Sequence, residues 1–286
     1  MLAVVVIAAC TGCSTSTTSS AGPALSLPSV DRVAGADARA SLNDATGEVV
    51  LPMSKYWYSD HENVLVNSAV AFLIYDCVEA KGYAIPPWDG QGKAMEDRTY
   101  GLWSRTLAAR NGDMPEIRVI PGVMEKQRQQ PPVSEVQQQA TNLCSNSIGR
   151  AGFPELLAGL AGDTSIQNRI VQVAAALTDR DPEYLAYRKD WENCVAGKGL
   201  KLAGAGSWFI QNGGSKEDEI RVALLDIDCK ESSGGARKPY DIVAQYQAAQ
   251  MKDHQAELNS LAEQKAAAVE RAKQVLRDHG VADARL

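Results

Sequence analysis

The stretch Cys77-Val78-Glu79-Ala80-Lys81-Gly82 recurs, with substitutions, as Cys194-Val195-Ala196-Gly197-Lys198-Gly199. Cys, Val, Lys and Gly occupy the same offsets in both copies, which makes four identities in six positions around a rare residue. Such self-similarity predicts an internal repeat of one supersecondary unit. In each copy a second cysteine follows near the end of a helix-like run, Cys144 in the first and Cys229 in the second.

Local signals predict that both copies are helical. Ser59 stands three residues before a Glu, the spacing of a capping box, and apolar residues then recur at helical intervals until Gly82. Asp181 followed by a proline is an equally clear helix start, and Ser215 begins the helix that leads to the last cysteine. Further helices are expected over 163–177 and, inside an irregular stretch from 86 to 132, over 103–109.

The N-terminal residues have the order of a processing signal. An apolar stretch ends in Ile7-Ala8-Ala9-Cys10, which resembles the bacterial lipobox, in which the cysteine thiol receives a diacylglycerol. Cys10 is the predicted lipidated residue, and Cys13 is the alternative. Residues 1–13 would then be the lipoprotein signal region and 14–48 a flexible tether rich in Ser, Thr and Ala. We expect the protein to be lipid-anchored at the extracytoplasmic face of the cell membrane, because no later segment has the roughly 18 apolar residues that a membrane span needs.

The cysteines outside the signal region are even in number, which in an extracytoplasmic chain predicts disulfides. Four cysteines allow three pairings, and the repeat favours Cys77 with Cys144 and Cys194 with Cys229. A redox or metal role would need a close Cys-x-x-Cys pair, which these four do not form. We therefore expect structural disulfides that staple each repeat.

The C-terminal region predicts one long helix. Residues 239–279 contain no Gly or Pro after Pro239, and a thin apolar stripe runs along them, interrupted by polar residues. Such a helix could pack along the two repeats as a lid, or project like one strand of a coiled coil and bind an envelope protein partner. Both readings remain open at this point.

The composition argues against several functions. The 286 residues include 29 basic and 35 acidic side chains, a net charge of −6 that disfavours nucleic-acid binding. With three His, no nucleophile elbow and no phosphate loop, we expect no catalytic residues, no metal and no cofactor. Asp226 and Asp228 lie two apart on a helix and therefore face different ways, so a capping or solvated role is favoured over paired acid–base chemistry.

Three tryptophans in predicted loops are the remaining candidates for binding. Trp88, Trp103 and Trp208 could line a groove for a sugar ring or a peptide, although the interpretation that they close the ends of a helical core is favoured. Trp191 lies on the apolar face beside Cys194 and is predicted to be core.

Several short motifs are distributed along the chain: Leu51-Pro52 with Tyr56, Cys77-Val78 with Gly82, Arg98 with Tyr100-Gly101-Leu102, Trp191 with Cys194-Val195, and Val222-Ala223 with Asp226 and Cys229. Together they resemble those of an uncharacterised family of actinobacterial cell-envelope lipoproteins. The resemblance runs from about Leu51 to the end and includes the long C-terminal helix. It implies a secreted, lipid-anchored helical body, in a family often associated with envelope transport or peptidoglycan systems, and it brings no catalytic residues.

The sequence therefore predicts an all-α protein of two disulfide-pinned helical repeats plus a long, coiled-coil-like C-terminal helix. The expected division is 1–13 signal, 14–48 tether, 49–150 first repeat, 151–238 second repeat and 239–286 C-terminal helix. The first functional hypothesis is a non-enzymatic binding or scaffolding component of the cell envelope. The alternatives are an envelope hydrolase with an unrecognised acidic site, and a receptor for a small ligand.

Overall fold

The computed structural model of the protein describes residues 27–84, 91–124, 133–152 and 165–286. Of these residues 60% are helical and 7% are in strands, so the helical class is confirmed. The helices are α1 (Asp60–Glu79), α2 (Arg105–Asn111), α3 (Glu135–Gly152), α4 (Ile166–Thr178), α5 (Pro182–Gly197), α6 (Lys216–Ser232), α7 (Lys238–Asp253) and α8 (Gln255–Asp278). Three short 3-10 helices are η1 (Arg32–Gly35), η2 (Pro52–Tyr56) and η4 (Asp283–Arg285).

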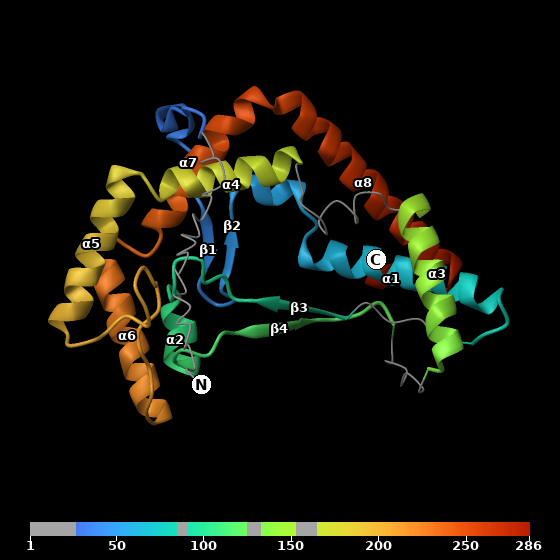
Figure 1. Cartoon of the computed structure of the whole chain (residues 1–286), viewed down its shortest axis with the longest axis horizontal. Helices are drawn as coiled ribbons and strands as arrows, with labels where there is room; N and C mark the ends of the chain where they lie inside the picture. The colour runs from blue at the N-terminus through green and yellow to red at the C-terminus, as the bar shows by residue number, and fades with distance from the viewer. Residues whose placement is uncertain (1–26, 85–90, 125–132, 153–164) are drawn as a thin grey trace, which may run out of the picture.

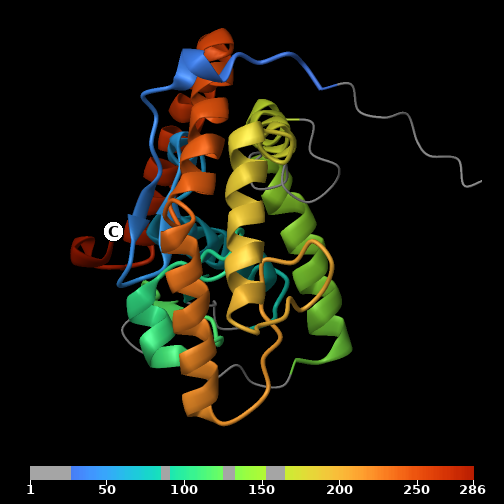
Figure 2. The same cartoon turned by 90° about the vertical axis from the view of Figure 1, so that its left-hand side faces the viewer.

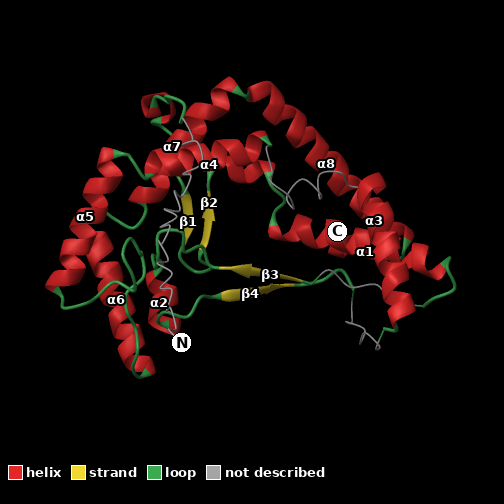
Figure 3. Ribbon diagram, in the orientation of Figure 1, coloured by secondary structure: helices red, strands yellow, loops and turns green. Residues whose placement is uncertain are grey.

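Two small antiparallel ribbons add strands that the sequence did not predict. In one ribbon β1 (Ser41–Asn43) pairs with β2 (Glu48–Val50), and in the other β3 (Gly92–Met95) pairs with β4 (Ile117–Ile120). The second ribbon lies inside the stretch predicted to be irregular, because strands of four residues between glycines and prolines have too little length to show a period. Figure 3 shows both ribbons between the helices of the two sides of the molecule.

Figure 1 shows the chain as an arch. Helices α5 and α6 form one side, α1 and α3 the other, α7 and α8 cross the top, and the β3–β4 ribbon joins the two sides below (Figure 1). The turned view in Figure 2 shows α5 and α6 running side by side. Each side of the arch has its own apolar cluster, one built from aromatic residues of α5 and α7 and the other from α1 and α8.

Both predicted disulfides are present. Cys77 is bonded to Cys144 and so joins α1 to α3, and Cys194 is bonded to Cys229 and joins α5 to α6. The predicted helix starts are also confirmed, because the Ser59 hydroxyl accepts from the Glu62 backbone N–H in a capping box. Each disulfide therefore staples one side of the arch.

The predicted units 49–150 and 151–238 are interleaved and do not form separate bodies. Helix α2, which belongs to the first unit, packs against α6 of the second. The connection between α1 and α3 carries the β3–β4 ribbon and α2, whereas a single β-bridge, Leu202 to Ile210, lies between α5 and α6 in the part of the chain that is described. The cysteine motif thus marks similar helix ends inside unlike connections.

The C-terminal helix is broken, which corrects the prediction of one continuous helix over 239–279. Helix α7 ends at Asp253, and α8 starts at Gln255 after His254, whose backbone angles of −119° and 21° are not helical. The break has no local signal because packing causes it: α7 lies against α4 and η1, whereas α8 lies against α1. Two differently oriented apolar surfaces are therefore matched by a helix break at one residue, His254.

Helix α8 uses its apolar stripe internally. Its residues Val269, Ala272 and Leu276 are buried against α1, and the interpretation as a packed lid is the one that the structure shows. At its end His279 stacks near Phe72, its Nδ1 lies 2.7 Å from the Val275 carbonyl oxygen and its Nε2 lies 3.0 Å from a carboxylate oxygen of Asp76. Burial alone would lower the pKa of His279, but these two contacts outweigh it and raise the pKa.

The segment predicted to be a flexible tether is folded from Asp31 onward, which corrects the boundary at residue 48. A Cβ on Gly35 would lie 2.1 Å from the Gln245 carbonyl oxygen of α7, so only glycine permits this approach. The Ala40 N–H donates to Asp241, and the Lys252 ammonium donates to the Ala34 carbonyl. Small residues, which composition counts as flexible, here let the backbone lie directly on a helix. Residues 1–26 lie outside the described residues.

Candidate functional site

The tryptophans predicted to line a binding groove belong to the core where the structure describes them. Trp103 and Trp208 are 6% and 7% exposed, and both lie in the aromatic cluster around Trp191. The Trp103 indole N–H donates to the Asp97 carbonyl, and that of Trp208 donates to the Tyr184 hydroxyl. The interpretation that they close a helical core therefore holds for these two, and a stacking role for them is not supported. Trp88 lies outside the described residues.

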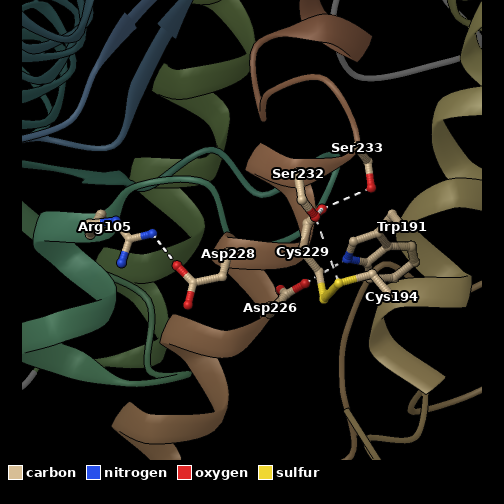
Figure 4. Close-up of a disulfide and its surroundings, with 8 residues drawn as sticks. All are labelled: Arg105, Trp191, Cys194, Asp226, Asp228, Cys229, Ser232 and Ser233. Atoms are coloured by element: carbon tan, nitrogen blue, oxygen red, sulfur yellow. Dashed lines mark hydrogen bonds and ion pairs between the residues drawn. A yellow bond between two sulfur atoms is a disulfide. The ribbon is translucent and has the colours of Figure 1, made fainter. Parts of the chain in front are cut away.

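A buried ion pair lies beside the second disulfide, at a position where a capping or solvated aspartate was expected. Asp226 and Lys230 are each 1% exposed, and their carboxylate oxygen and ammonium nitrogen are 3.1 Å apart. Figure 4 shows Asp226 directed toward Trp191, whose indole N–H donates to it at 2.7 Å. Lys230 also donates to the Leu102 carbonyl, and burial lowers its pKa despite the Asp226 carboxylate. Asp228 points the other way and forms an exposed ion pair with Arg105 (Figure 4).

The ion pair has structural partners and almost no open space. The cavity beside Asp226 measures about 10 Å³, which is room for about one water molecule. With its carboxylate and ammonium already bonded to side-chain and backbone groups, this pair is a packing element of the α5–α6 side.

A groove of about 580 Å³ opens inside the arch, and its size is that of an ordinary ligand site. Five segments contribute to it: β2, η2 with the turn into α1, β3, β4 and α8. Its lining residues are Glu48, Val49, Val50, Ser54, Lys55, Trp57, Tyr58, Ser59, Asp60, Lys93, Ala94, Met95, Asp97, Arg118 and Lys265.

The turn into α1 gives the groove its aromatic side chain. Pro52 begins η2, and the Leu51 N–H donates to the Ser54 hydroxyl, which fixes the short helix. Tyr56 then points into the core, and the extended residue that follows, Trp57, is left 38% exposed in the groove wall. An indole held in this way on a rigid turn is suited to contact a ligand with an apolar face.

The groove carries more basic than acidic side chains, although the whole chain has a charge of −6. Four cations, Lys55, Lys93, Arg118 and Lys265, face three carboxylates, Glu48, Asp60 and Asp97.

Two of these cations already have partners. Arg118 lies 3.5 Å from Asp60, and Lys265 lies 2.8 Å from Glu62. Burial would raise the pKa of Glu62, but hydrogen bonds from Lys265 and Ser59 outweigh it and lower that pKa. Lys55 and Lys93 are exposed and have no carboxylate within 4 Å among the described residues, so they are the cations that an incoming anionic group would meet.

One stretch of the sequence signals this groove, although its residues were not among the predicted binding residues. Lys55-Tyr56-Trp57-Tyr58 places three aromatic rings and a cation in succession just before a helix cap. Apart from β2, which lies just before this stretch, the remaining groove residues come mainly from β3, β4 and α8, which are distant in sequence, so no local pattern could have grouped them with it.

Within the described ranges no group of three or more His, Cys, Asp or Glu side chains is arranged to hold a metal ion. In the same ranges no helix is both long and apolar enough to cross a membrane. Cys10 and Cys13 lie outside the described residues. Comparison of the chain with protein families, with curated proteins and with solved structures gave no match.

Proposed function

We propose that this protein is a non-enzymatic binding or scaffolding component of the cell envelope, and that the groove inside the arch is its binding site. The observation that carries the proposal is the combination, in one groove, of the exposed Trp57 ring with Lys55 and Lys93, which have no carboxylate partner in the described chain. A groove with an apolar face and with cations that lack a carboxylate partner fits a partner that offers apolar and anionic groups together.

The N-terminal sequence supports the location of this site. The lipobox-like Ile7-Ala8-Ala9-Cys10 would place the folded body at the extracytoplasmic face of the membrane, with lipid on Cys10 or else on Cys13. The resemblance to actinobacterial envelope lipoproteins points the same way. Two disulfides suit an oxidising compartment.

The C-terminal helix would contact the partner through one side chain and not through its apolar stripe. Because the apolar stripe of α8 is covered by α1, the helix would contribute to binding through Lys265, which lines the groove. The partner would be an envelope protein, for example part of a transport or peptidoglycan-associated system.

Site-directed photocrosslinking in the native membrane tests the binding role. A photoreactive phenylalanine analogue at Trp57 should give one discrete crosslinked product, and the same analogue at Leu143, which is 64% exposed on α3, should not. Changing both Lys55 and Lys93 to Glu should remove the product. Equal products from the two positions, or none from Trp57, would refute the groove as the binding site.

Mass spectrometry of the mature N-terminus tests the anchor separately. We expect a diacylglycerol-modified Cys10 peptide that disappears in Cys10→Ala and persists in Cys13→Ala. The reverse pattern would assign the lipid to Cys13, and an unmodified N-terminus in membrane-free fractions would exclude the anchor.

A further inference from the structure

The free edge of β3 lies in the groove, and its hydrogen-bonding pattern can be derived from the register. Glu96 N–H donates to the Glu116 carbonyl, and residue 96 stands opposite 116 when the β3–β4 register is continued. In an antiparallel pair, bonded and non-bonded positions alternate. Ala94 is therefore bonded to Arg118 across the ribbon, whereas the backbone N–H and C=O groups of Lys93 and Met95 point away from β4.

These outward groups have no hydrogen-bond partner among the residues that the structure describes. Lys93 and Met95 are both exposed, and both line the groove. Two residues spaced by two along an open edge offer the donors and acceptors that an added strand needs. The groove is closed at one end, where Asp97 N–H donates to the Gly47 carbonyl at 2.9 Å, so a strand would enter along β3 from the Gly92 end.

We infer that the groove binds its partner as an extended peptide that adds a third strand to the ribbon at the edge of β3. This inference rests on the proposed binding function and names the form that the partner takes there. The charge of the groove favours an acidic peptide over a basic one, because cations outnumber carboxylates there and two of the cations lack carboxylate partners.

The two faces of the ribbon predict the order of side chains in the peptide. Lys93 and Met95 lie on the outer face with Val119 and Ile117 opposite them, and Met95 is 65% exposed. A peptide residue beside Lys93 should be acidic, and the residue two positions away, beside Met95, should be apolar.

The intervening peptide residue would point to the other face of the ribbon, which carries Arg118 opposite Ala94. The groove that the peptide enters is also lined by the cations Lys55 and Lys265. This intervening residue should also be acidic. The predicted signature is therefore two acidic residues followed or preceded by an apolar one, according to the direction of the added strand.

A display library of random nonapeptides, selected on the purified full-length protein, tests the signature without knowledge of the natural partner. We expect enrichment of the acid–acid–apolar triplet, and at least tenfold weaker binding of a selected peptide to Met95→Pro, which removes an outward N–H while leaving the bonds to β4. Met95→Leu is the matched control and should bind normally. No enrichment, or enrichment of basic peptides, would overturn the inference.

Two measurements on the unmodified protein do not depend on the proline variant folding. In the selected peptide, N-methylation of alternate backbone amides should abolish binding and methylation of the intervening ones should not. Peptide addition should slow hydrogen exchange of the Lys93 and Met95 amides, whereas the Ala94 amide should already be slow in the free protein. Uniform sensitivity to methylation, or new protection at Ile117 and Val119 of the opposite edge, would refute addition to β3.

The same experiments would also detect a second copy of this chain bound at the edge of β3. Concentration-dependent dimers with Lys93 and Met95 amides protected in the absence of peptide would overturn the inference. If the Trp57 crosslink forms in membranes but Met95→Pro does not weaken it, strand addition is wrong and the proposed function stands. If no crosslink forms, the proposed function fails as well.

Discussion

Removing either partner of the buried Asp226–Lys230 pair alone should lower the free energy of unfolding by a large amount. In Lys230→Met the Asp226 carboxylate, 1% exposed, loses its counter-ion and keeps only the Trp191 N–H. Breaking a buried pair from one side costs about 3–5 kcal/mol, because an uncompensated charge stays buried. Asp226→Asn should fall near the lower end of that range, since burial lowers the pKa of Lys230 and lets the amine become neutral.

The double variant should be much milder than the sum of the two single variants. With Asp226→Asn and Lys230→Met together no buried charge remains, and the main loss is the hydrogen bond to the Leu102 carbonyl, about 1–3 kcal/mol. The coupling free energy should therefore be about 3 kcal/mol or more. Urea unfolding at pH 7 with the disulfides intact, followed by circular dichroism, measures all three values.

A matched control is available on the same helix. Asp228 and Arg105 form an ion pair with side chains 46% and 53% exposed, and Asp228→Asn should change the free energy of unfolding by less than about 1 kcal/mol. The pH dependence adds a second check. Burial lowers the pKa of Lys230 in the folded state, so the free energy of unfolding of Asp226→Asn should rise as pH approaches the pKa of an unfolded lysine, about 10.4, because the unfolded state still binds that proton. A loss under about 1 kcal/mol in Lys230→Met, or additive single variants, would refute this reasoning.

Three further predictions concern stability. The pKa of His279 is raised in the folded state, so its contribution to the free energy of unfolding is complete below about pH 6.5 and is lost as pH rises through the folded pKa. The stability advantage of the wild type over His279→Asn should therefore shrink between pH 5.5 and 8.5 in urea titrations, and an advantage that stays constant over this range would contradict the contact with Asp76. In the same assay Cys194→Ser should lower the free energy of unfolding by about 2–4 kcal/mol, because the disulfide closes a loop of 35 positions in the unfolded chain. A loss below about 1 kcal/mol would show that the disulfide does not constrain the unfolded chain in this way. Gly35→Ala should expose residues 31–50 to limited proteolysis, whereas Gly204→Ala, where a Cβ meets nothing within 4 Å, should not; equal cleavage would disprove the close packing on α7.

Much of the fold was predictable because it is locally encoded. The caps at Ser59 and Asp181 set helix starts through contacts within three residues, and structure and prediction agree there. The recurring Cys motif marked helix ends that carry the disulfides. These features depend on neighbours in sequence, so the pattern of residue types is sufficient to find them.

The structure differs from the sequence-based predictions where contacts between distant parts of the chain determine the conformation. The helix break at His254 follows from the two unlike surfaces under α7 and α8, and no residue type at the break predicts it. The burial of Asp226 depends on Trp191 of another helix. The groove likewise assembles Trp57, Lys93 and Lys265 from three parts of the chain, and only their packing brings them together.

The course of the first folded residues along α7 has a mechanical consequence. Ala34 contacts Lys252, Ala36 contacts Gln245 and Ala40 contacts Asp241, so the segment runs antiparallel to a helix of about 24 Å. A force applied upstream of these residues and directed along α7 would stretch all the contacts at once, in shear. A force directed away from α7 would open them one at a time, beginning at Lys252. Resistance to pulling at this end of the chain should therefore depend on direction.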